Sequence, residues 1–408
     1  MTIVKANGEL WVWGLDRASW ENDERDRTLV KAWKLSDQVA SAVPVGTDTW
    51  ADGNVFLSVL HEDASLWTWD ILFKKNAYGE ISPPYIAQAP EKIMEGVSTV
   101  MADNPHSSSF WVLKTNQSLW GGWREEIHTT FYIEIKDFNF EKKMDGIHAI
   151  WVNPVYNSQI YALRGSGALF AFGENAQGQL GVGFSYGNAK HVYLKHPTRV
   201  INSAASVITQ SDWSEIYMHT MAIKKDHTLW LWGRDIWFDS SFATDLSALE
   251  GSFFSNKPIK VMDNVASAAM GVDHCLVIKQ DGSLWVWGYN NAGQLGIGTF
   301  EHMRKPVKIM DNVISVTASN RHSLALQADG NLWAWGDNEF GQLGTGDTIS
   351  RHEPIQIMEN VVSIFTTATC NAAVKQDGSV WIWGYTVLHP SHLHLGEEPI
   401  LKPICILE

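Results

Sequence analysis

Apolar and polar positions alternate in short runs along the chain, and turn residues separate the runs. The segment before Trp333 reads PVKIMDNVISVTASNRHSLALQADGN, and close copies of it precede Trp285 and Trp381. Each copy predicts three short β-strands, because apolar residues at every second position give a strand one buried face. The Asp-Gly pair that closes the third run is typical of a tight hairpin turn, so a fourth strand should follow directly.

The strand after this turn reads Leu-Trp-x-Trp-Gly in its best copies, and the motif occurs eight times at spacings of 48 to 60 residues. Residues i and i+2 of a strand share a face, so Trp285 and Trp287 are expected to lie side by side. The copies hold 14 of the 21 tryptophans, and Phe170 and Phe172 replace the pair in the fourth copy. We interpret the pairs as packing between neighbouring sheets, because a ligand platform would not need so many equivalent copies.

An antiparallel four-stranded unit of about 50 residues, repeated along the whole chain, predicts an all-β protein with the β-propeller fold. Seven complete four-stranded blades follow residue 39, and the residues before it supply an N-terminal partial blade of three strands. An eight-bladed ring is favoured over seven blades, because an unpacked N-terminal piece would expose a sheet edge and a tryptophan-rich face. The chain is expected to form a single β-propeller domain, 1–408, with approximate blades 1–38, 39–96, 97–146, 147–204, 205–264, 265–312, 313–360 and 361–408.

A glycine-rich segment follows the third strand of three blades. Its residues in blade 6 are Trp287, Gly288, Asn291, Gly293, Gln294, Leu295, Gly296 and Gly298. In blade 7 they are Trp335, Gly336, Asn338, Gly341, Gln342, Leu343, Gly344 and Gly346. In blade 4 they are Gly173, Asn175, Gly178, Gln179, Leu180, Gly181 and Gly183.

Blade 6 also carries a G-x-x-H pair, Gly271 and His274, whereas His322 and His106 keep only the histidine. Together these residues resemble the regulator of chromosome condensation repeat, strongly over residues 265–384 and weakly before residue 165. The resemblance implies a propeller, usually of seven blades. The near-identical repeats at 265–384 favour a bacterial-type member.

The glycine-rich segments are not expected to hold a nucleotide. A phosphate-binding loop carries Gly-Lys-Ser/Thr or opens a helix after a strand, and no lysine follows Gly296. The glycines instead predict a tight loop whose backbone needs φ > 0. We therefore predict no cofactor.

The corresponding segments of the other five blades have lost the glycine pattern, and they lie at 15–31, 71–90, 124–143, 234–257 and 385–402. Variable loops on a rigid scaffold are the usual place for binding. Aromatic residues in them predict a surface for a protein partner: Trp237, Phe238, Phe242, Phe253, Phe254, Tyr78, Tyr85, Phe131 and Tyr132. The alternative is that these aromatics fold back over the rim of the blade.

Composition narrows the possible partners. The net charge of −14 argues against binding of a nucleic-acid backbone. No apolar run reaches the ~18 residues of a membrane helix, and the first residues are not expected to form a signal peptide, because no basic start is followed by an apolar stretch. We expect a monomeric cytoplasmic protein without membrane contact, although export without a leader stays open.

Candidate chemistry in the sequence is sparse. Three scattered cysteines predict free thiols rather than disulfides or a zinc site. His389, His392 and His394 could place two imidazoles on one metal, but a solvated loop is the simpler interpretation, and we predict no metal. No residue set suggests a nucleophile or a paired acid and base, so no enzyme activity is expected.

These observations favour a non-catalytic propeller that binds a protein through variable loops on one face. The resemblance also suggests a guanine-nucleotide exchange factor for a small GTPase, although the wedge-like insertion of that group is not found. A propeller-type enzyme inhibitor is a third possibility, since a bacterial propeller inhibitor of β-lactamase resembles this repeat. A glycan-binding lectin that uses exposed aromatics is the fourth.

Overall fold

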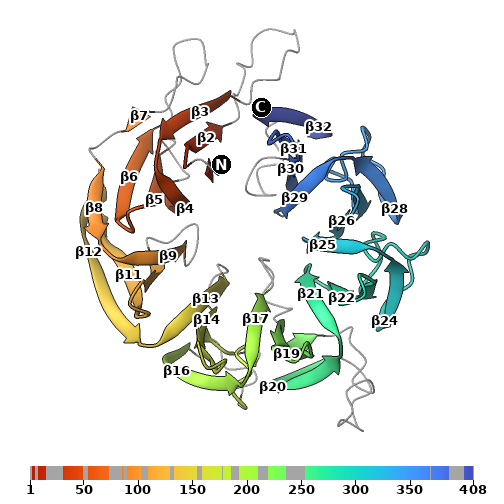
Figure 1. Cartoon of the computed structure of the whole chain (residues 1–408), viewed down its shortest axis with the longest axis horizontal. Coiled ribbons are helices and arrows are strands. Elements are labelled where there is room, and N and C mark those ends of the chain that lie inside the picture. Colours follow the sequence, from red (N-terminus) through yellow and green to blue (C-terminus); the bar gives the residue numbers. More distant parts are fainter. Residues whose placement is uncertain are drawn as a thin grey trace. The chain divides into compact units, whose positions relative to one another are not determined.

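The structure is a computed structural model, and it describes residues 2–4, 8–14, 31–48, 54–72, 85–86, 90–102, 109–128, 133–153, 159–176, 178–184, 193–209, 219–235, 253–367, 369–385 and 399–407. Every regular element within these ranges is a β-strand (Figure 1). The described residues contain no helix that could cross a membrane. The all-β prediction is confirmed.

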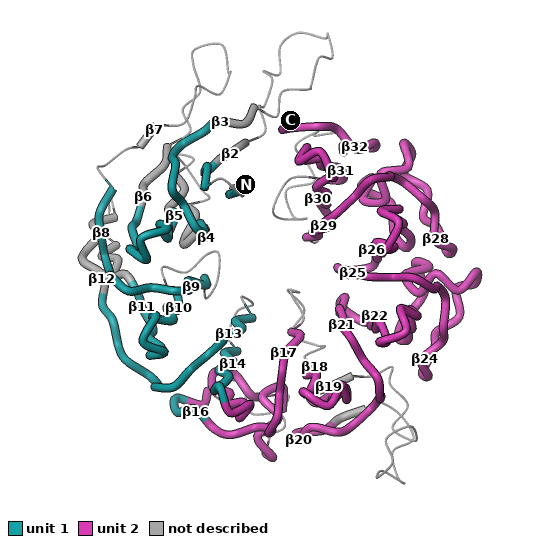
Figure 2. The backbone as a smooth tube through the Cα atoms, in the orientation of Figure 1, with its two compact units in different colours: residues 1–165, 195–197 teal, residues 166–194, 198–408 magenta. Residues whose placement is uncertain are grey.

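The chain divides into two compact units, residues 1–165 with 195–197 and residues 166–194 with 198–408 (Figure 2). In the first unit, the strands are β1 (Thr2–Val4), β2 (Leu10–Gly14), β3 (Lys31–Ser36), β4 (Val39–Asp48), β5 (Asn54–His61), β6 (Leu66–Leu72), β7 (Tyr85–Ile86), β8 (Glu91–Met94), β9 (Val97–Ala102), β10 (Ser109–Lys114), β11 (Leu119–His128), β12 (Ile133–Met144), β13 (Ile147–Asn153) and β14 (Gln159–Arg164).

The strands that follow are β15 (Leu169–Glu174), β16 (Tyr193–Ile201), β17 (Ala204–Thr209), β18 (His219–Lys224), β19 (Leu229–Asp235), β20 (Phe253–Met262), β21 (Val265–Met270), β22 (His274–Lys279), β23 (Leu284–Gly288), β24 (Met303–Met310), β25 (Val313–Ala318), β26 (His322–Gln327), β27 (Leu332–Gly336), β28 (Arg351–Met358), β29 (Val361–Thr366), β30 (Cys370–Lys375), β31 (Val380–Gly384) and β32 (Ile400–Leu407).

Neighbouring strands pair antiparallel in sequence order, as the repeat predicts. Six sheets have four strands, from β9–β12 to β29–β32. The sheet β4–β8 has five, because its fourth position is divided between β7 and β8, which both pair with β6. The N-terminal sheet β1–β3 has three strands. Seven complete blades and one partial blade are therefore present, while closure into one eight-bladed domain stays a prediction.

The second tryptophan of each pair lies in the core between sheets of the second unit. Trp232, Trp287, Trp335 and Trp383 are each 0% exposed. Trp335 packs among side chains of the preceding sheet, including Leu276, Val286 and Leu295. Trp287 packs in the same way on Met221 and Leu231. Burial of a large aromatic side chain is the main stabilising contribution at such a junction.

In the sheets of the second unit, the first tryptophan of each pair is only half-buried and lies near the hairpin turn between the second and third strands. The indole Nε1 of Trp285 donates to Ser283 Oγ at 2.9 Å, and that hydroxyl donates to Asp281 Oδ1 at 2.6 Å. Lys279 Nζ lies 4.5 Å from the centre of the Trp285 ring, within cation–π distance. The bond from Ser283 lowers the pKa of Asp281. The prediction that both tryptophans of a pair pack between sheets is therefore confirmed for the second tryptophan and only partly for the first.

The sheet β9–β12 solves the same packing problem with different residues. Gly122 stands where other sheets carry the second tryptophan, and a Cβ there would lie 2.9 Å from Phe110 and from Phe140. Phe110 itself stands where the sheets of the second unit carry small polar residues, and it is fully buried. The small residue Gly122 on the third strand is thus compensated by the large residue Phe110 on the second strand, which keeps the core closely packed.

We predict that Trp335→Ala lowers the free energy of unfolding by about 3–5 kcal/mol, the range for large-to-small core changes. Trp333→Ala removes the same side chain from a half-buried site and should lower it by less. Chemical denaturation of both variants measures the difference. A loss below ~1 kcal/mol for Trp335→Ala would contradict the buried placement.

Candidate functional site

The connections between strands fall at opposite ends of each sheet. At the turn end, the Asp-Gly hairpin joins the second strand to the third, and a short turn leads from the fourth strand into the next sheet. At the loop end, the third strand joins the fourth through the segments 289–302 and 337–350 in two sheets of the second unit. The glycine-rich motif and the predicted partner surface both belong to the loop end.

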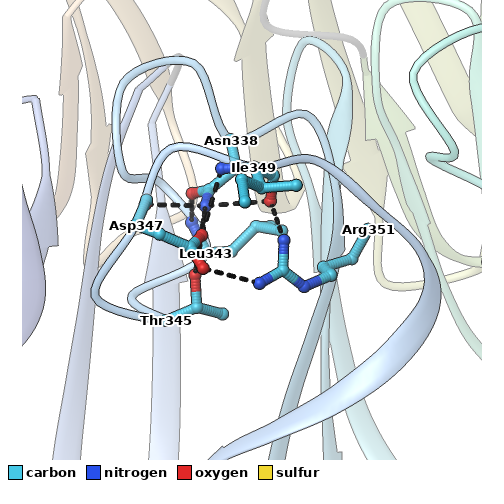
Figure 3. Close-up of polar contacts among 6 residues, drawn as sticks. All are labelled: Asn338, Leu343, Thr345, Asp347, Ile349 and Arg351. Carbon is cyan, nitrogen blue, oxygen red and sulfur yellow. Dashed lines mark hydrogen bonds and ion pairs between the residues drawn. The ribbon is translucent and has the colours of Figure 1, made fainter.

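A buried asparagine closes each glycine-rich loop (Figure 3). Asn338 Nδ2 donates to the main-chain oxygens of Asp347 and Ile349 at 2.9 and 3.2 Å. Its Oδ1 accepts the Leu343 N–H at 2.9 Å. One side chain therefore pins the loop at three points, which satisfies buried backbone groups that no strand partner reaches.

The equivalent residue in the sheet β21–β24 is Asn290, which donates to Thr299 O at 2.8 Å and accepts from Leu295 N at 2.9 Å. The sequence analysis assigned this position to Asn291, and that assignment is wrong by one residue. Asn291 donates to the Tyr289 hydroxyl at the surface. The spacing Asn-x-x-Gly, which Asn290 and Gly293 share with the other two loops, is the signal that identifies the correct residue.

An ion pair supports the loop of the sheet β25–β28. Arg351 Nη2 lies 2.7 Å from Asp347 Oδ2, and the guanidinium also donates to the Ile349 carbonyl (Figure 3). The Ile349 N–H and then Arg351 lower the pKa of Asp347. Both charged side chains therefore bind within the loop and stabilise its conformation.

The glycines adopt the predicted left-handed backbone, with φ of +82° at Gly293, +68° at Gly296 and +80° at Gly298. Their N–H groups donate to Asn290 O, Gly293 O and His352 O. A phosphate cradle needs such N–H groups turned toward the ligand. Here they are used inside the protein, which agrees with a structural role for the loop.

The main-chain oxygen of the loop glutamine receives the buried indole of the next sheet. Gln294 O accepts from Trp335 Nε1 at 2.9 Å, and Gln342 O accepts from Trp383 Nε1 at 3.0 Å. Gln179 O accepts from Trp232 Nε1 at 2.8 Å. The three loops thus make the same hydrogen bond to the sheet that follows.

Each glutamine oxygen takes a second bond from the second strand of that same sheet. The donors are Thr220 Oγ1 at 3.2 Å, Ser323 Oγ at 2.9 Å and Asn371 Nδ2 at 2.7 Å. In the opposite sense, the last loop glycine donates to the fourth strand of the next sheet, as Gly346 N does to Leu401 O at 2.8 Å. We call this set of bonds the glycine clasp.

Buried imidazoles form a polar row beside the clasp. His274 Nε2 lies 2.9 Å from Ser323 Oγ, and His322 Nε2 lies 3.0 Å from Asn371 Oδ1. Ser323 already donates its hydroxyl proton to Gln294 O, so His274 Nε2 must be the donor in its pair. His219 Nε2 approaches Cys275 Sγ at 3.9 Å in the same register. The hydroxyl and amide oxygens that accept these bonds therefore place a proton on Nε2 of His274 and His322.

Most of the predicted partner surface lies outside the described residues: Trp237, Phe238, Phe242, Tyr78, Phe131 and Tyr132. The backbone places the other three in strands, with Tyr85 opposite Leu72, Phe253 opposite Asp235 and Phe254 opposite Arg234. His389, His392 and His394 also lie outside the described residues.

Two of the predicted loops are shorter than the sequence analysis proposed. The segment 124–143 is mostly strand, because β11 continues to His128 and β12 begins at Ile133. The segment 234–257 contains the end of β19 and the start of β20, which leaves 236–252 as the connection.

The described residues offer little for metal or thiol chemistry. No group of three or more candidate metal ligands occurs among them. None of the three cysteines is in a disulfide, as predicted, and Cys275 and Cys370 are buried while Cys405 is exposed. Burial raises the pKa of the Cys370 thiol to about 12, which makes it a poor nucleophile.

Two models of the regulator of chromosome condensation (RCC1) repeat match the chain, one at residues 281–326 and 329–374, the other at residues 265–294 and 313–342. The matched residues include two of the three glycine-rich loops, 289–302 and 337–350. Residues 265–374 therefore carry RCC1 repeats, and the antiparallel sheets of the chain match those of solved RCC1 propellers.

Solved propellers of this kind share the fold. Yeast RCC1 (Prp20), seen bound to Kap60, is 20% identical with a TM-score of 0.54, over 84% of this chain and 82% of that one. Human WBSCR16 is 17% identical with a TM-score of 0.56, over 90% of this chain and 100% of that one.

Among curated proteins, the human E3 ubiquitin-protein ligase HERC2 is 26% identical over 143 residues, which is 35% of this chain and 3% of that protein. The match therefore spans a small part of this relative. The relatives named come from yeast and human, and they lend no support to the predicted bacterial origin.

We predict that Gly296→Ala destabilises the protein more than Gly378→Ala. Both positions have positive φ, +68° and +88°, so both variants carry roughly 1–2 kcal/mol of backbone strain. A Cβ at Gly296 would also lie 2.8 Å from Trp335 Nε1, whereas a Cβ at Gly378 would have no other atom within 4 Å. Urea denaturation of the two variants compares them, and equal losses would contradict the close approach.

Stability should fall as the pH is lowered from 7.5 to 5, because His322 is buried in its neutral form. Burial lowers the pKa of His322 from 6.5 to about 4, and the nearby His274 lowers it further while Asn371 and Asp337 oppose the shift. The unfolded state therefore binds the proton first, and stability present above pH 6.5 is lost toward pH 4, by about 2 kcal/mol at pH 5.

Denaturation at several pH values tests this, with His322→Gln as the control variant. Glutamine is the residue at the same position of the sheet β13–β16, Gln159, and it does not titrate. The variant should lose the part of the pH dependence that belongs to His322. An unchanged slope would contradict the assignment.

Proposed function

We propose that the chain is a non-catalytic interaction protein that binds a protein partner at the loop end of its sheets, through the connections that lack the glycine clasp. The observation that carries this proposal is the contrast between loops within one chain. In three loops the polar groups form hydrogen bonds to the next sheet. A substitution in such a loop would weaken the contact between the two sheets. The remaining connections have no such sequence, so they are the part of the loop end that can be shaped for recognition.

The composition of these connections supports a protein as the ligand. The segment 236–252, which leaves and re-enters its sheet at the loop end, contains Trp237, Phe238 and Phe242. Aromatic side chains are enriched among the residues that dominate protein interfaces. The net charge of −14 favours a partner with a basic patch and an association that slows as salt is added. The exchange-factor, inhibitor and lectin hypotheses stay predictions, since no described contact favours one of them.

The test begins with capture of partners from a lysate of the source organism, followed by titration of the purified partner. We expect Trp237→Ala to weaken binding by about 2 kcal/mol or more, as for an interface hot spot. Its melting temperature should stay near that of the unchanged protein. Phe300→Ala is the matched control, because Phe300 is 54% exposed on a clasped loop at the same end of a sheet.

Two outcomes would contradict this proposal. A large fall in melting temperature for Trp237→Ala would assign that residue to the rim of its sheet rather than to a partner. A loss of binding in Phe300→Ala but not in Trp237→Ala would place the partner on the glycine loops instead.

A further inference from the structure

The first strands of four successive sheets in the second unit present an uncharged surface to solvent. In Figure 1 these strands follow one another in the order β17, β21, β25 and β29, and each contacts the next. Their second and fifth residues are exposed or half-exposed, and they are Ala205, Ile208, Ala266, Ala269, Ile314, Thr317, Val362 and Phe365.

Large apolar side chains are concentrated on the last two of these strands. Ile314 is 58% exposed on β25, and Val362 and Phe365 are 52% and 57% exposed on β29. The matching positions of β21 are alanines, Ala266 and Ala269, so the fold does not require bulk there. We call Ile314, Val362 and Phe365 the first-strand patch. Exposed apolar side chains on neighbouring strands that packing does not demand are characteristic of an interaction surface.

The charges beside this patch are not balanced as they are in the neighbouring sheets. The turn before β21 pairs Lys260 with Asp263, and the turn before β25 pairs Lys308 with Asp311, both at 2.7 Å. The turn before β29 has Gln356 in place of the lysine, and its Nε2 lies 3.3 Å from Glu359 Oε1. A neutral amide leaves the Glu359 carboxylate with its full charge, three residues from Val362.

We propose that the first-strand patch and Glu359 together bind a segment of a partner protein in which apolar side chains stand next to lysine or arginine. The apolar part would cover Ile314, Val362 and Phe365, and the cation would take the place that lysine holds in the sibling turns. This surface is separate from the loop-end surface proposed above. The two proposals can be tested independently, because the two surfaces consist of different residues.

The probe is a short fluorescein-labelled peptide of alternating leucine and lysine, with a leucine–glutamate peptide of the same length as its counterpart. Fluorescence anisotropy with the full chain should show saturable binding of the leucine–lysine peptide only. Phe365→Ala should weaken it about tenfold, as expected for an aromatic anchor. Val362→Ala should weaken it by less, because a smaller apolar surface is lost.

The charge is tested by Gln356→Lys, which introduces the residue that sibling turns already carry and should therefore fold normally. We expect it to weaken the peptide as Glu359→Gln does, severalfold at low salt. Asp311→Asn is the matched control, because Lys308 already neutralises that carboxylate. Phe300→Ala controls for loss of an exposed aromatic elsewhere on the same unit.

Absence of saturable binding would overturn the proposal, and so would binding that Phe365→Ala and Gln356→Lys leave unchanged. Equal binding of both peptides would show that charge plays no part, which also contradicts it. Analytical ultracentrifugation addresses a second copy of this chain as the occupant. A concentration-dependent dimer that Phe365→Ala abolishes would assign the patch to self-association instead.

Discussion

The main-chain oxygen of the loop glutamine is the acceptor on which the glycine-rich sheets depend. It lies in a loop of one sheet and receives two donors from the next, an indole and a small polar side chain. A single hydrogen bond contributes only about 1 kcal/mol net, much less than burial of the tryptophan. Its effect is directional, because an indole buried without an acceptor would carry an unpaired N–H. The bond therefore fixes how the aromatic ring sits between the sheets.

Several features of the repeat follow from this one acceptor. Gly296 must lack a side chain because the indole of Trp335 lies against it. The second strand must carry a small polar residue at Ser323, where an aliphatic side chain would leave the oxygen with one donor fewer. Asn290 must close the loop so that the glutamine faces the next sheet. In this chain the asparagine, the glycines and the glutamine occur together in all three loops.

The sheet β9–β12 shows which part of the arrangement is packing and which part is orientation. Phe110 fills the volume that the second tryptophan occupies elsewhere, and Gly122 makes room for it. Neither residue can donate a hydrogen bond from its side chain. Volume is therefore the general requirement for stacking of these sheets, and the clasp is an addition that gives some junctions a fixed geometry.

The strand order and the sheet composition could be predicted from the sequence, because the alternation recurs in almost every repeat and Asp-Gly turns mark the hairpins of the last three. The burial of each tryptophan could not be predicted. A spacing of two residues shows that both side chains lie on the same face of the strand, but it does not show how far each lies from the end of the sheet. The first part of β12 was missed, because the aromatic and charged residues of 133–140 were interpreted as a loop. Their alternation, with Ile133, Ile135, Phe138 and Phe140, was already a strand signal.

The clasp also explains why some loops of this repeated fold keep a structural role while other segments can vary. A loop that supplies an acceptor, a donor and a close glycine contact to its neighbour is constrained at each of those positions. A residue such as Phe300 can still vary, because its side chain is 54% exposed and takes no part in the clasp. At the turn end, side chains such as Asp281, Ser283 and Trp285 form a chain of bonds within one sheet, while main-chain bonds such as Val313 N to Gly282 O join the turn to the next sheet. Substitution at the turn end therefore changes surface charge without moving a junction, and the exchange of lysine for Gln356 is one such change.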